Sequence, residues 1–500
     1  MFKKILIANR GEIATRIIRT CEELEIDSIA VYSDVDRLSP HVLKAKEAYC
    51  IGSAPSSQSY LNTKKILSII KEKNIDAVHP GYGFLSENYY FADEIKKNGV
   101  NWIGPSPESI KIMGDKILAR SLADSVGAPL IPGTNKAIND SNRALEAAQK
   151  IGFPVLIKAA GGGGGKGMRK VNTENEFKTA ISRAQSEAKN SFSDSRVYIE
   201  KFLEDPHHIE IQIFADNYGN VVSLGERECS IQRRYQKIIE EAPSPFINDS
   251  LRKSLSEIAI KITKACKYSG AGTVEFLVDK HKNFYFLEIN TRLQVEHPIT
   301  ESVTNIDLVK EQISVAAGKK LSFTQNEVQI TGHSIECRIY AENGFENFLP
   351  STGYISDMII PQGIGVRFDE GIRINQKITP FYDPLLGKLI TWAPDRRTAI
   401  QRMIRSLNEF YISGVITTIP FCLMIISHEL FKNGSYSTLT LDNIYDEILS
   451  EKKIAQKNMI IPMSISAAFH SGSSNKNKTI KKEKKEKSTW KEQGDKNCLR

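Results

Sequence analysis

Over the first 110 residues, short apolar runs alternate with amphipathic helical patterns, and this order restricts the possible folds more than any other feature of the chain. We expect strands at Lys4 to Ala8, Ile29 to Tyr32, Ala77-Val78 and Trp102-Ile103, and helices at Ile13 to Leu24 and Thr63 to Lys73. Such alternation predicts a doubly wound parallel sheet. Ligands bind at the carboxyl ends of strands in these sheets, which here are followed by Asn9 to Glu12 and His79 to Asn88. The glycines and prolines of these two loops also fit ordinary turns.

The chain has 500 residues, 41% of them hydrophobic and 25% charged, which predicts a globular protein of several domains. We expect a cytoplasmic protein with no membrane segment, because the sequence has no run of 18 apolar residues and the N-terminus is too polar for a signal peptide. The seven cysteines are scattered and include no Cys-x-x-Cys pair, so we expect reduced thiols rather than disulfides or a zinc site.

The net charge of +8 is concentrated at the C-terminus. Residues 471 to 500 hold ten Lys/Arg and four Asp/Glu, a balance of +6, which leaves +2 for the rest of the chain. We therefore expect no nucleic-acid partner, and a basic, disordered tail over residues 450 to 500. Such a tail is either a solvated extension or a docking arm for an acidic partner chain.

Residues 110 to 410 predict further mixed α and β structure. We expect helices around Ser109 to Val126, a small α+β lid, a block with three strands around one helix, and a strand-rich region from Gln329 that ends in helices near Arg396 to Glu409. The lid is predicted from a strand at Pro154 to Ala159, a helix near Glu174 to Lys189 and a strand at Arg196 to Lys201. In the next block, strands are expected at His208 to Phe214, Thr273 to Val278 and Phe284 to Asn290, and a helix at Leu251 to Cys266.

A run of five glycines, Gly161 to Gly165, follows the strand that carries Lys158 and precedes Lys166. Backbone N–H groups of such a loop can approach phosphate oxygens without obstruction from Cβ atoms. The run is not a Walker A loop, because Ala160 replaces its first glycine and Lys166 is followed by glycine. A dinucleotide-binding match is weak, and a flexible linker is the other interpretation. The flanking lysines favour a loop over a triphosphate.

Polar and apolar residues alternate from residue 288 to residue 298. With a period of two, Glu288, Asn290, Arg292, Gln294 and Glu296 project from one face, and Ile289, Leu293 and Val295 from the other. The polar positions span about 26 Å if the strand is extended at roughly 3.3 Å per residue. A half-buried edge strand with a wet face would also alternate. The mixture of acids, amides and a guanidinium favours an active site.

Glu275 precedes Glu288 by thirteen positions, which is enough for an antiparallel hairpin that turns at Asp279 to Asn283. Mg²⁺ prefers oxygen ligands, which these two carboxylates and Asn290 could supply. With Lys116, Lys158 and the glycine run, they predict a site for a nucleotide and a metal ion.

Several motifs together closely resemble those of the biotin carboxylase family, the ATP-grasp component of biotin-dependent carboxylases. They are Gly114-Asp-Lys116, the glycine run, Glu228 to Lys237, Glu241-Ala-Pro, Glu288 to Pro298 and Glu336-Cys-Arg338. The resemblance extends from about Phe2 to Leu449. It implies an α/β and α+β multidomain fold with a doubly wound N-terminal domain (1–113), an ATP-grasp domain (114–318) with a mobile lid at about 130–203, and a strand-rich C-terminal α+β domain (330–449).

The resemblance implies an enzyme that carboxylates biotin on a carrier, using ATP and bicarbonate and passing through carboxyphosphate. The implied ATP-binding residues are Lys116, Lys158, Gly163, Gly164, Gly165, Glu200, Lys201, Leu203, His208, Gln232, Tyr235, Glu275 and Glu288. Glu275, Glu288 and Asn290 would hold Mg²⁺ or Mn²⁺, with two ions expected. Lys237, Arg292, Gln294 and Val295 would bind bicarbonate, and Tyr82 and Arg338 would bind biotin. The implied catalytic residues are Arg292, Glu296, Lys237 and Arg338, with Glu296 as the base.

Two positions near the nucleotide are ambiguous. Tyr235 stands where many family members have histidine, which puts a direct phosphate contact in doubt, although tyrosine can donate one hydrogen bond. From the Pro-x-His-x-Glu spacing we expect His208 to be the ligand and His207 to be exposed.

Partners follow from an absent motif. The family's carriers hold biotin on the lysine of an Ala-Met-Lys-Met type of turn, and this sequence has no Met-Lys pair. We therefore expect the carrier and the carboxyltransferase to be other chains, and the resemblance implies a homodimer. The acceptor, which could be acetyl-CoA, propionyl-CoA or pyruvate, stays open.

Two other functions are possible. One is an ATP-grasp ligase for a larger carboxylate, which Arg338 and the residues from Arg292 to Glu296 disfavour. The other is a noncatalytic nucleotide sensor or a nucleic-acid binder that uses the basic tail. It is disfavoured because Glu275, Glu288, Asn290 and Glu296 are all present.

Overall fold

The computed structural model describes residues 1–134, 138, 140–159, 168–192 and 195–454. The chain divides into two compact units, Met1–Asn443 and Ile444–Arg500. In the second unit, the described residues 444–454 are helical. The predicted glycine run, with Gly163, Gly164 and Gly165, and residues 455–500 of the predicted tail lie outside the described residues. The tail was predicted to be disordered from residue 450, which is wrong for residues 450–454, because they continue the helix.

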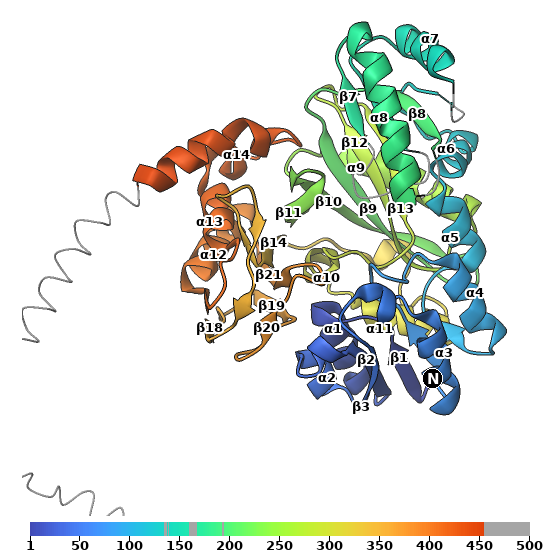
Figure 1. The fold of residues 1–500 in the computed structure, drawn as a ribbon, viewed down its shortest axis with the longest axis vertical. Coiled ribbons are helices and arrows are strands. Elements are labelled where there is room, and N and C mark those ends of the chain that lie inside the picture. Colours follow the sequence, from blue (N-terminus) through green and yellow to red (C-terminus); the bar gives the residue numbers. More distant parts are fainter. Residues whose placement is uncertain (135–137, 139, 160–167, 193–194, 455–500) are drawn as a thin grey trace, which may run out of the picture. The chain divides into compact units, whose positions relative to one another are not determined.

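The N-terminal part of the first unit is a five-stranded parallel sheet in the order β3-β2-β1-β4-β5 (Figure 1). Its strands are β1 (Lys4–Ile7), β2 (Asp27–Ser33), β3 (Glu47–Gly52), β4 (Ala77–His79) and β5 (Asn101–Trp102), and its main helices are α1 (Gly11–Glu23), α3 (Thr63–Glu72) and α4 (Tyr89–Lys97). The predicted doubly wound sheet is confirmed. Strand β3 escaped prediction because it is only partly buried and lacks a long apolar run.

The order of this sheet reverses between β1 and β4, and a ligand crevice is expected at the carboxyl ends of these two strands. The loops Asn9 to Glu12 and His79 to Asn88 begin there. They are joined by the Asn9 side chain, whose Nδ2 donates to Pro80 O at 2.6 Å and to Tyr82 O at 2.7 Å.

The largest sheet has eight antiparallel strands in the order β13-β12-β9-β10-β11-β14-β21-β19. They are β9 (His207–Ala215), β10 (Val221–Arg233), β11 (Gln236–Ala242), β12 (Gly270–Val278), β13 (Phe284–Asn290), β14 (His333–Tyr340), β19 (Val366–Glu370) and β21 (Leu385–Ala393). One face packs on α9 (Asp249–Ala265), where Ile209, Ile211 and Ile213 join the core. The other face of β9 carries His208, Glu210 and Gln212, which are also buried. A polar face that is closed to solvent is a suitable place for charged chemistry.

A separate three-stranded sheet, β7-β6-β8, is covered by two helices (Figure 1). The strands are β6 (Val155–Ala159), β7 (Arg169–Val171) and β8 (Val197–Lys201), and the helices are α7 (Ser141–Ile151) and α8 (Glu174–Phe192). Val155, Ile157, Phe177 and Ile181 contribute to a core of its own. This is the α+β arrangement predicted for the lid.

The remaining elements connect and complete these sheets. The helices are α2 (Pro40–Lys44), α5 (Pro107–Gly114), α6 (Lys116–Ser125), α10 (His297–Thr304), α11 (Leu308–Ala316), α12 (Arg396–Glu409), α13 (Ile419–Ser427) and α14 (Glu429–Lys432), with short 3₁₀ turns at Asp34–Asp36, Ser56–Gln58 and Gln325–Glu327. Three two-stranded sheets pair β15 (Glu342–Asn343) with β16 (Leu349–Pro350), β17 (Gly353–Tyr354) with β20 (Lys377–Ile378), and β18 (Asp357–Ile359) with β22 (Tyr411–Ser413). Among the described residues, no helix is both long and apolar enough to span a bilayer.

The predicted extended strand from residue 288 to residue 298 is wrong beyond Asn290, where β13 ends. Residues 291 to 296 are irregular, with a bend at Arg292 and a turn at Val295 and Glu296, and α10 begins at His297 with Pro298 in its first turn. Proline favours the first turn of a helix, and Leu293 is fully buried, so the chain bends inward instead of running on as a strand. The side chains of this segment therefore form a compact group rather than a line of about 26 Å.

Candidate active site

The predicted metal ligands lie on the hairpin of β12 and β13. Glu275 and Glu288 are directly opposite each other across the two strands, as the thirteen-residue spacing suggested. Asn290 Nδ2 donates to Glu275 Oε1 at 2.9 Å, and Lys116 Nζ, at the start of α6, is 3.5 Å from Glu288 Oε2. Two carboxylates and an amide oxygen on adjacent strands fit a hard cation such as Mg²⁺.

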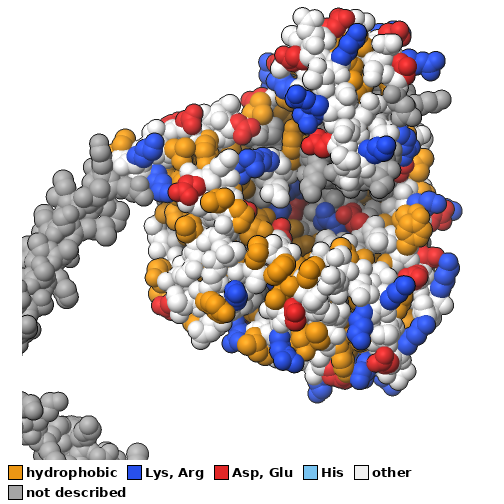
Figure 2. Space-filling view, in the orientation of Figure 1, with side chains coloured by type: hydrophobic (Ala, Val, Ile, Leu, Met, Phe, Trp, Pro, Cys, Tyr) orange, Lys and Arg blue, Asp and Glu red, His pale blue; other side chains and the backbone are white. Residues whose placement is uncertain are grey.

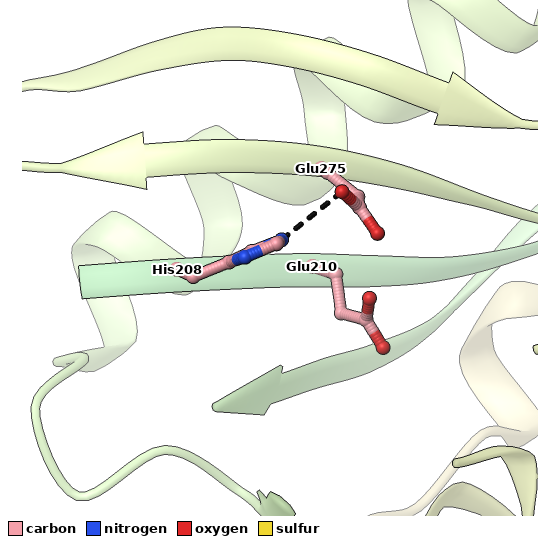
Figure 3. A group of neighbouring side chains, drawn as sticks. All are labelled: His208, Glu210 and Glu275. Carbon is pink, nitrogen blue, oxygen red and sulfur yellow. Dashed lines mark ion pairs between the residues drawn. The ribbon is translucent and has the colours of Figure 1, made fainter. Parts of the chain in front are cut away.

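His208 lies beside this group and comes from the next strand (Figure 3). His208 and Glu210 are on the same face of β9, and Glu210 is paired with Glu275 of β12. His208 Nε2 lies 3.1 Å from Glu275 Oε2, within the distance of an ion pair. Burial alone would raise the pKa of Glu275, but Lys237 and His208 hold it well below its usual range.

The prediction that His207 is exposed is wrong. Only 8% of its surface is accessible, because β9 is buried on both faces. Its Nδ1 lies 3.2 Å from Glu228 Oε2, and its ring stacks on Phe246 with centroids 3.5 Å apart. His207 therefore belongs to the packing on the opposite face, and His208 is the histidine that reaches the site.

The ammonium group of Lys237 joins three carboxylates. Its Nζ is 2.6 Å from Glu210 Oε2, 3.0 Å from Glu275 Oε1 and 2.7 Å from Glu296 Oε1. Burial would lower the pKa of Lys237, but the field of Cys229 and of these carboxylates holds it well above its usual range. One fixed positive charge thus connects the metal ligands to the predicted base.

Glu296 has a second cationic partner in Arg338. Arg338 NH2 lies 2.9 Å from Glu296 Oε2, and its Nε donates to Glu240 Oε1 at 2.6 Å. Burial favours a neutral Glu296, yet Lys237, Arg338 and Arg227 outweigh it and hold the pKa of Glu296 well below its usual range. Burial raises the pKa of Glu240 to about 7, although Arg338 opposes it.

Arg292 connects the remaining polar residues of the segment after β13. Its NH1 donates to Gln294 Oε1 at 3.0 Å, and its NH2 donates to Asn290 Oδ1 at 3.2 Å. Gln294 Nε2 in turn donates to Glu275 Oε1 at 3.4 Å. Two of the predicted metal ligands, Glu275 and Asn290, therefore share one hydrogen-bonded group with three predicted bicarbonate residues, Arg292, Gln294 and Lys237.

A cavity of about 480 Å³ brings the predicted biotin residues together. Its lining includes Tyr82, Arg292, Val295 and Arg338. The hydroxyl of Tyr82 is buried and has no hydrogen-bond partner among the described residues, so it can bond a ligand. In Figure 2 the surface is hollowed over β9, β10 and β13, and side chains of both charges meet inside the hollow.

The predicted nucleotide residues on the lid are held by internal contacts. Lys158 and Arg120 both pair with the buried carboxylate of Glu200. Lys201 donates its backbone N–H to Pro132 O at 2.7 Å and its Nζ to Gly152 O at 2.9 Å. Leu203, two residues further on, lies just after β8.

The other predicted nucleotide residues lie on the hairpin of β10 and β11. Gln232 is buried on β10 and is paired across the hairpin with Lys237. Tyr235 occupies the turn with φ +65° and is 54% exposed.

Sequence reasoning missed Glu210, Glu240 and Arg227. Arg227 is fully buried, pairs with Glu210, and donates to Gln212 Oε1 at 2.7 Å and to Thr300 Oγ1 at 2.9 Å. A usable signal was the alternation of His208, Glu210 and Gln212 with isoleucines on β9.

Comparisons with known proteins agree along most of the chain. Residues 1–110 match the family described as biotin carboxylase, N-terminal domain; residues 115–324 match the carbamoyl-phosphate synthase L chain, ATP binding domain; and residues 336–443 match the biotin carboxylase C-terminal domain.

Similar proteins include a biotin carboxylase of Nostoc sp., 51% identical over 437 residues, a match that covers 87% of this chain and 98% of the relative. A pyruvate carboxylase subunit of Methanothermobacter thermautotrophicus is 49% identical, with coverage of 94% and 96%. A solved structure of the biotin carboxylase domain dimer of Hydrogenobacter thermophilus 2-oxoglutarate carboxylase, in complex with MgADP, ADP and bicarbonate, has a TM-score of 0.87 and 43% identity, with coverage of 89% and 98%. The chain belongs to the biotin carboxylase family.

Proposed function

We propose that this protein carboxylates biotin on a carrier, using ATP and bicarbonate and passing through carboxyphosphate. The observation that carries the proposal is the position of Lys237, whose ammonium contacts both Glu275, a predicted metal ligand, and Glu296, the predicted base. An active site that activates bicarbonate next to the γ-phosphate of ATP needs its metal ligands and its base within a few ångströms of each other. The geometry of Lys237 supports that arrangement.

Glu275, Glu288 and Asn290 would hold Mg²⁺ or Mn²⁺ with the nucleotide, with two ions expected. When bound, such an ion neutralises charge on the transferring phosphate. Phosphate oxygens would be contacted by Lys158, by His208 and by Lys116. Lys116 lies beside Glu288. Gly163, Gly164 and Gly165 would cover the triphosphate, and Glu200, Lys201, Leu203, Gln232 and Tyr235 would bind the rest of the nucleotide.

Arg292, Gln294, the Val295 backbone and Lys237 would bind bicarbonate. A guanidinium can donate two parallel hydrogen bonds to such an oxyanion. In the protein without substrate, NH1 and NH2 of Arg292 donate to Gln294 and Asn290, so bicarbonate has to take over these contacts. Glu296 would then remove the bicarbonate proton, and the freed oxygen would attack the γ-phosphorus of ATP, with ADP as the leaving group.

Glu296 would become an effective base only when substrate is bound, because its pKa depends on the position of Lys237. While Lys237 and Arg338 both contact Glu296, its pKa is held low and it is a weak base. When Lys237 turns to a substrate oxygen, its attraction on Glu296 weakens and the pKa of Glu296 rises. Proton transfer is thereby coupled to occupation of the site.

Arg338 and Tyr82 would bind biotin in the cavity of about 480 Å³ that they line. Carboxyphosphate would release CO₂ and phosphate, and the phosphate would take the proton from the ureido nitrogen of biotin. Arg338 would stabilise the enolate oxygen that results, and the nitrogen would then bond the carbon of CO₂. Arg338 is suited to this task because it is buried and its charge is fixed.

We also propose that the carrier and the carboxyltransferase are other chains and that this protein forms a homodimer. Support comes from the names of similar proteins, which include a domain dimer and one subunit of a carboxylase. Removing residues 471–500 tests the docking role of the tail. A loss of activity with the carrier protein, but not with free biotin, would indicate docking, and equal activity with both would indicate a solvated extension.

The decisive experiment measures the rate of ADP release with free biotin and bicarbonate both present, and then with each of the two omitted in turn. We expect the rate to fall when either is left out. A rate that responds to neither omission would refute the proposed function.

A further inference from the structure

Glu87 contacts the predicted active-site residue Arg292, although it is not itself one of the predicted substrate-binding residues. It lies in the loop from His79 to Asn88 that the sequence singled out. Its Oε2 accepts a hydrogen bond from Arg292 Nε at 2.8 Å. Its Oε1 accepts from Thr291 N at 3.2 Å and from Thr291 Oγ1 at 3.3 Å. One carboxylate therefore holds two consecutive residues at the point where β13 ends.

The contact to Nε fixes the orientation of the Arg292 side chain. A guanidinium is planar and its five N–H groups keep fixed directions, so holding Nε also sets the directions of NH1 and NH2. With Glu87 on the Nε edge, NH1 and NH2 face Gln294 and Asn290. That edge is the one on which bicarbonate would take over the contacts with Gln294 and Asn290.

The loop that carries Glu87 is itself held in place. Asn9 Nδ2 donates to Pro80 O and Tyr82 O, and Asn88 Oδ1 accepts from Phe91 N at 2.9 Å at the start of α4. Gly81 has φ +61°, and a Cβ atom at this position would lie 2.9 Å from Asn9 Nδ2. The loop therefore sets Glu87 firmly, and it also places Tyr82 in the wall of the cavity that Arg292 lines.

We propose that Glu87 is a positioning residue that holds the NH1 and NH2 edge of Arg292 toward bicarbonate and ties Arg292 to the loop of Tyr82. The proposal rests on the proposed function, because it assumes that Arg292 binds bicarbonate. Glu87 acts through Arg292 and does not touch the reacting atoms. Its side chain is 42% exposed, so replacing it leaves no buried cavity.

The test compares Glu87→Gln with Glu87→Asp in steady-state ADP release with free biotin. Glutamine keeps the shape but removes the charge, and we expect the KM for bicarbonate to rise about tenfold, the usual scale for one charge-assisted hydrogen bond. The KM for ATP should stay within about twofold, since the phosphate contacts are made elsewhere. Aspartate keeps the charge and should restore the KM for bicarbonate to within about threefold of the unmodified protein. Glu94→Gln, at an exposed position of α4, is the matched control.

The outcomes separate the two proposals. If the unmodified protein shows no dependence on biotin and bicarbonate, the proposed function fails. If it shows that dependence but Glu87→Gln leaves the KM for bicarbonate unchanged, only the positioning role is overturned. The positioning role is also overturned if Glu87→Gln raises the KM values for bicarbonate and ATP equally, or if Glu87→Asp fails to restore the KM for bicarbonate. A Tm measured for each variant checks that folding is intact.

Discussion

Glu275 and Glu288 lie directly opposite each other in the antiparallel pair of β12 and β13. Like charges at such positions destabilise a sheet unless cations neutralise them. Each carboxylate has one nearby lysine, with Lys237 at 3.0 Å from Glu275 and Lys116 at 3.5 Å from Glu288. The pair is therefore placed to gain from a divalent cation that binds with the nucleotide.

Replacing Glu288 with glutamine should weaken metal binding without unfolding the hairpin, because 30% of its side chain is exposed. We expect the Mg²⁺ concentration for half-maximal ADP release to rise at least about tenfold, since a metal site loses affinity on this scale when one of its supporting groups is removed. Mg²⁺ titrations at fixed ATP measure the change. Glu257→Gln, an exposed position on α9, is the control. An unaltered Mg²⁺ dependence would remove Glu288 from the metal site.

Glu296→Gln should lower turnover at least about a hundredfold, the usual scale for a general base. ATP binding should persist, because the predicted phosphate ligands lie on other elements. Turnover and direct nucleotide titration separate the two effects. Near-normal turnover would show that another group removes the bicarbonate proton.

Tyr235→Phe tests whether the hydroxyl reaches the nucleotide. If it donates one hydrogen bond, its loss should raise the KM for ATP about fivefold, which corresponds to about 1 kcal/mol. The KM for bicarbonate should not change, because Tyr235 lies in the turn between β10 and β11 and is 54% exposed. An unaltered KM for ATP would leave Tyr235 without a nucleotide contact.

Local patterns were enough to predict the parallel N-terminal sheet and the hairpin that pairs Glu275 with Glu288. Both depend on short-range signals, namely alternation of apolar runs and the spacing needed for one turn. The same signal failed after Asn290, because alternation cannot show that burial of Leu293 and a helix start at Pro298 bend the chain.

Contacts between side chains on strands that are distant in the sequence could not be predicted from the sequence. Glu240 reaches Arg338 because β11 pairs with β14, almost one hundred positions later in the chain. Glu210 meets Lys237 through the β9-β10-β11 order of the sheet. His207 was misjudged because the pattern of one strand does not reveal that both of its faces are covered.

Glu241, away from the catalytic group, should make stability depend on pH. Its fully buried carboxylate lies 2.5 Å from His333 Nε2 and 2.7 Å from Arg396 Nε. Burial alone would raise the pKa of Glu241, but these two partners lower it from the ordinary 4.5 to about 2. A depressed pKa stabilises the folded protein above pH 4.5, and this contribution disappears as the pH falls from 4.5 toward 2.

Glu241→Gln should therefore destabilise the protein by about 3 kcal/mol at pH 7, at about 1.4 kcal/mol per pKa unit. The difference in Tm between the variant and the unmodified protein should narrow on acidification, because the unmodified protein loses the contribution of its ionised carboxylate while glutamine does not titrate. Thermal unfolding at a series of pH values between 7 and 3 measures this difference in Tm. Glu257→Gln is the control, and its Tm should stay close to that of the unmodified protein at every pH. A Tm difference that stays constant down to pH 3 would mean that hydrogen bonding or packing of Glu241, and not its charge, provides the stabilisation.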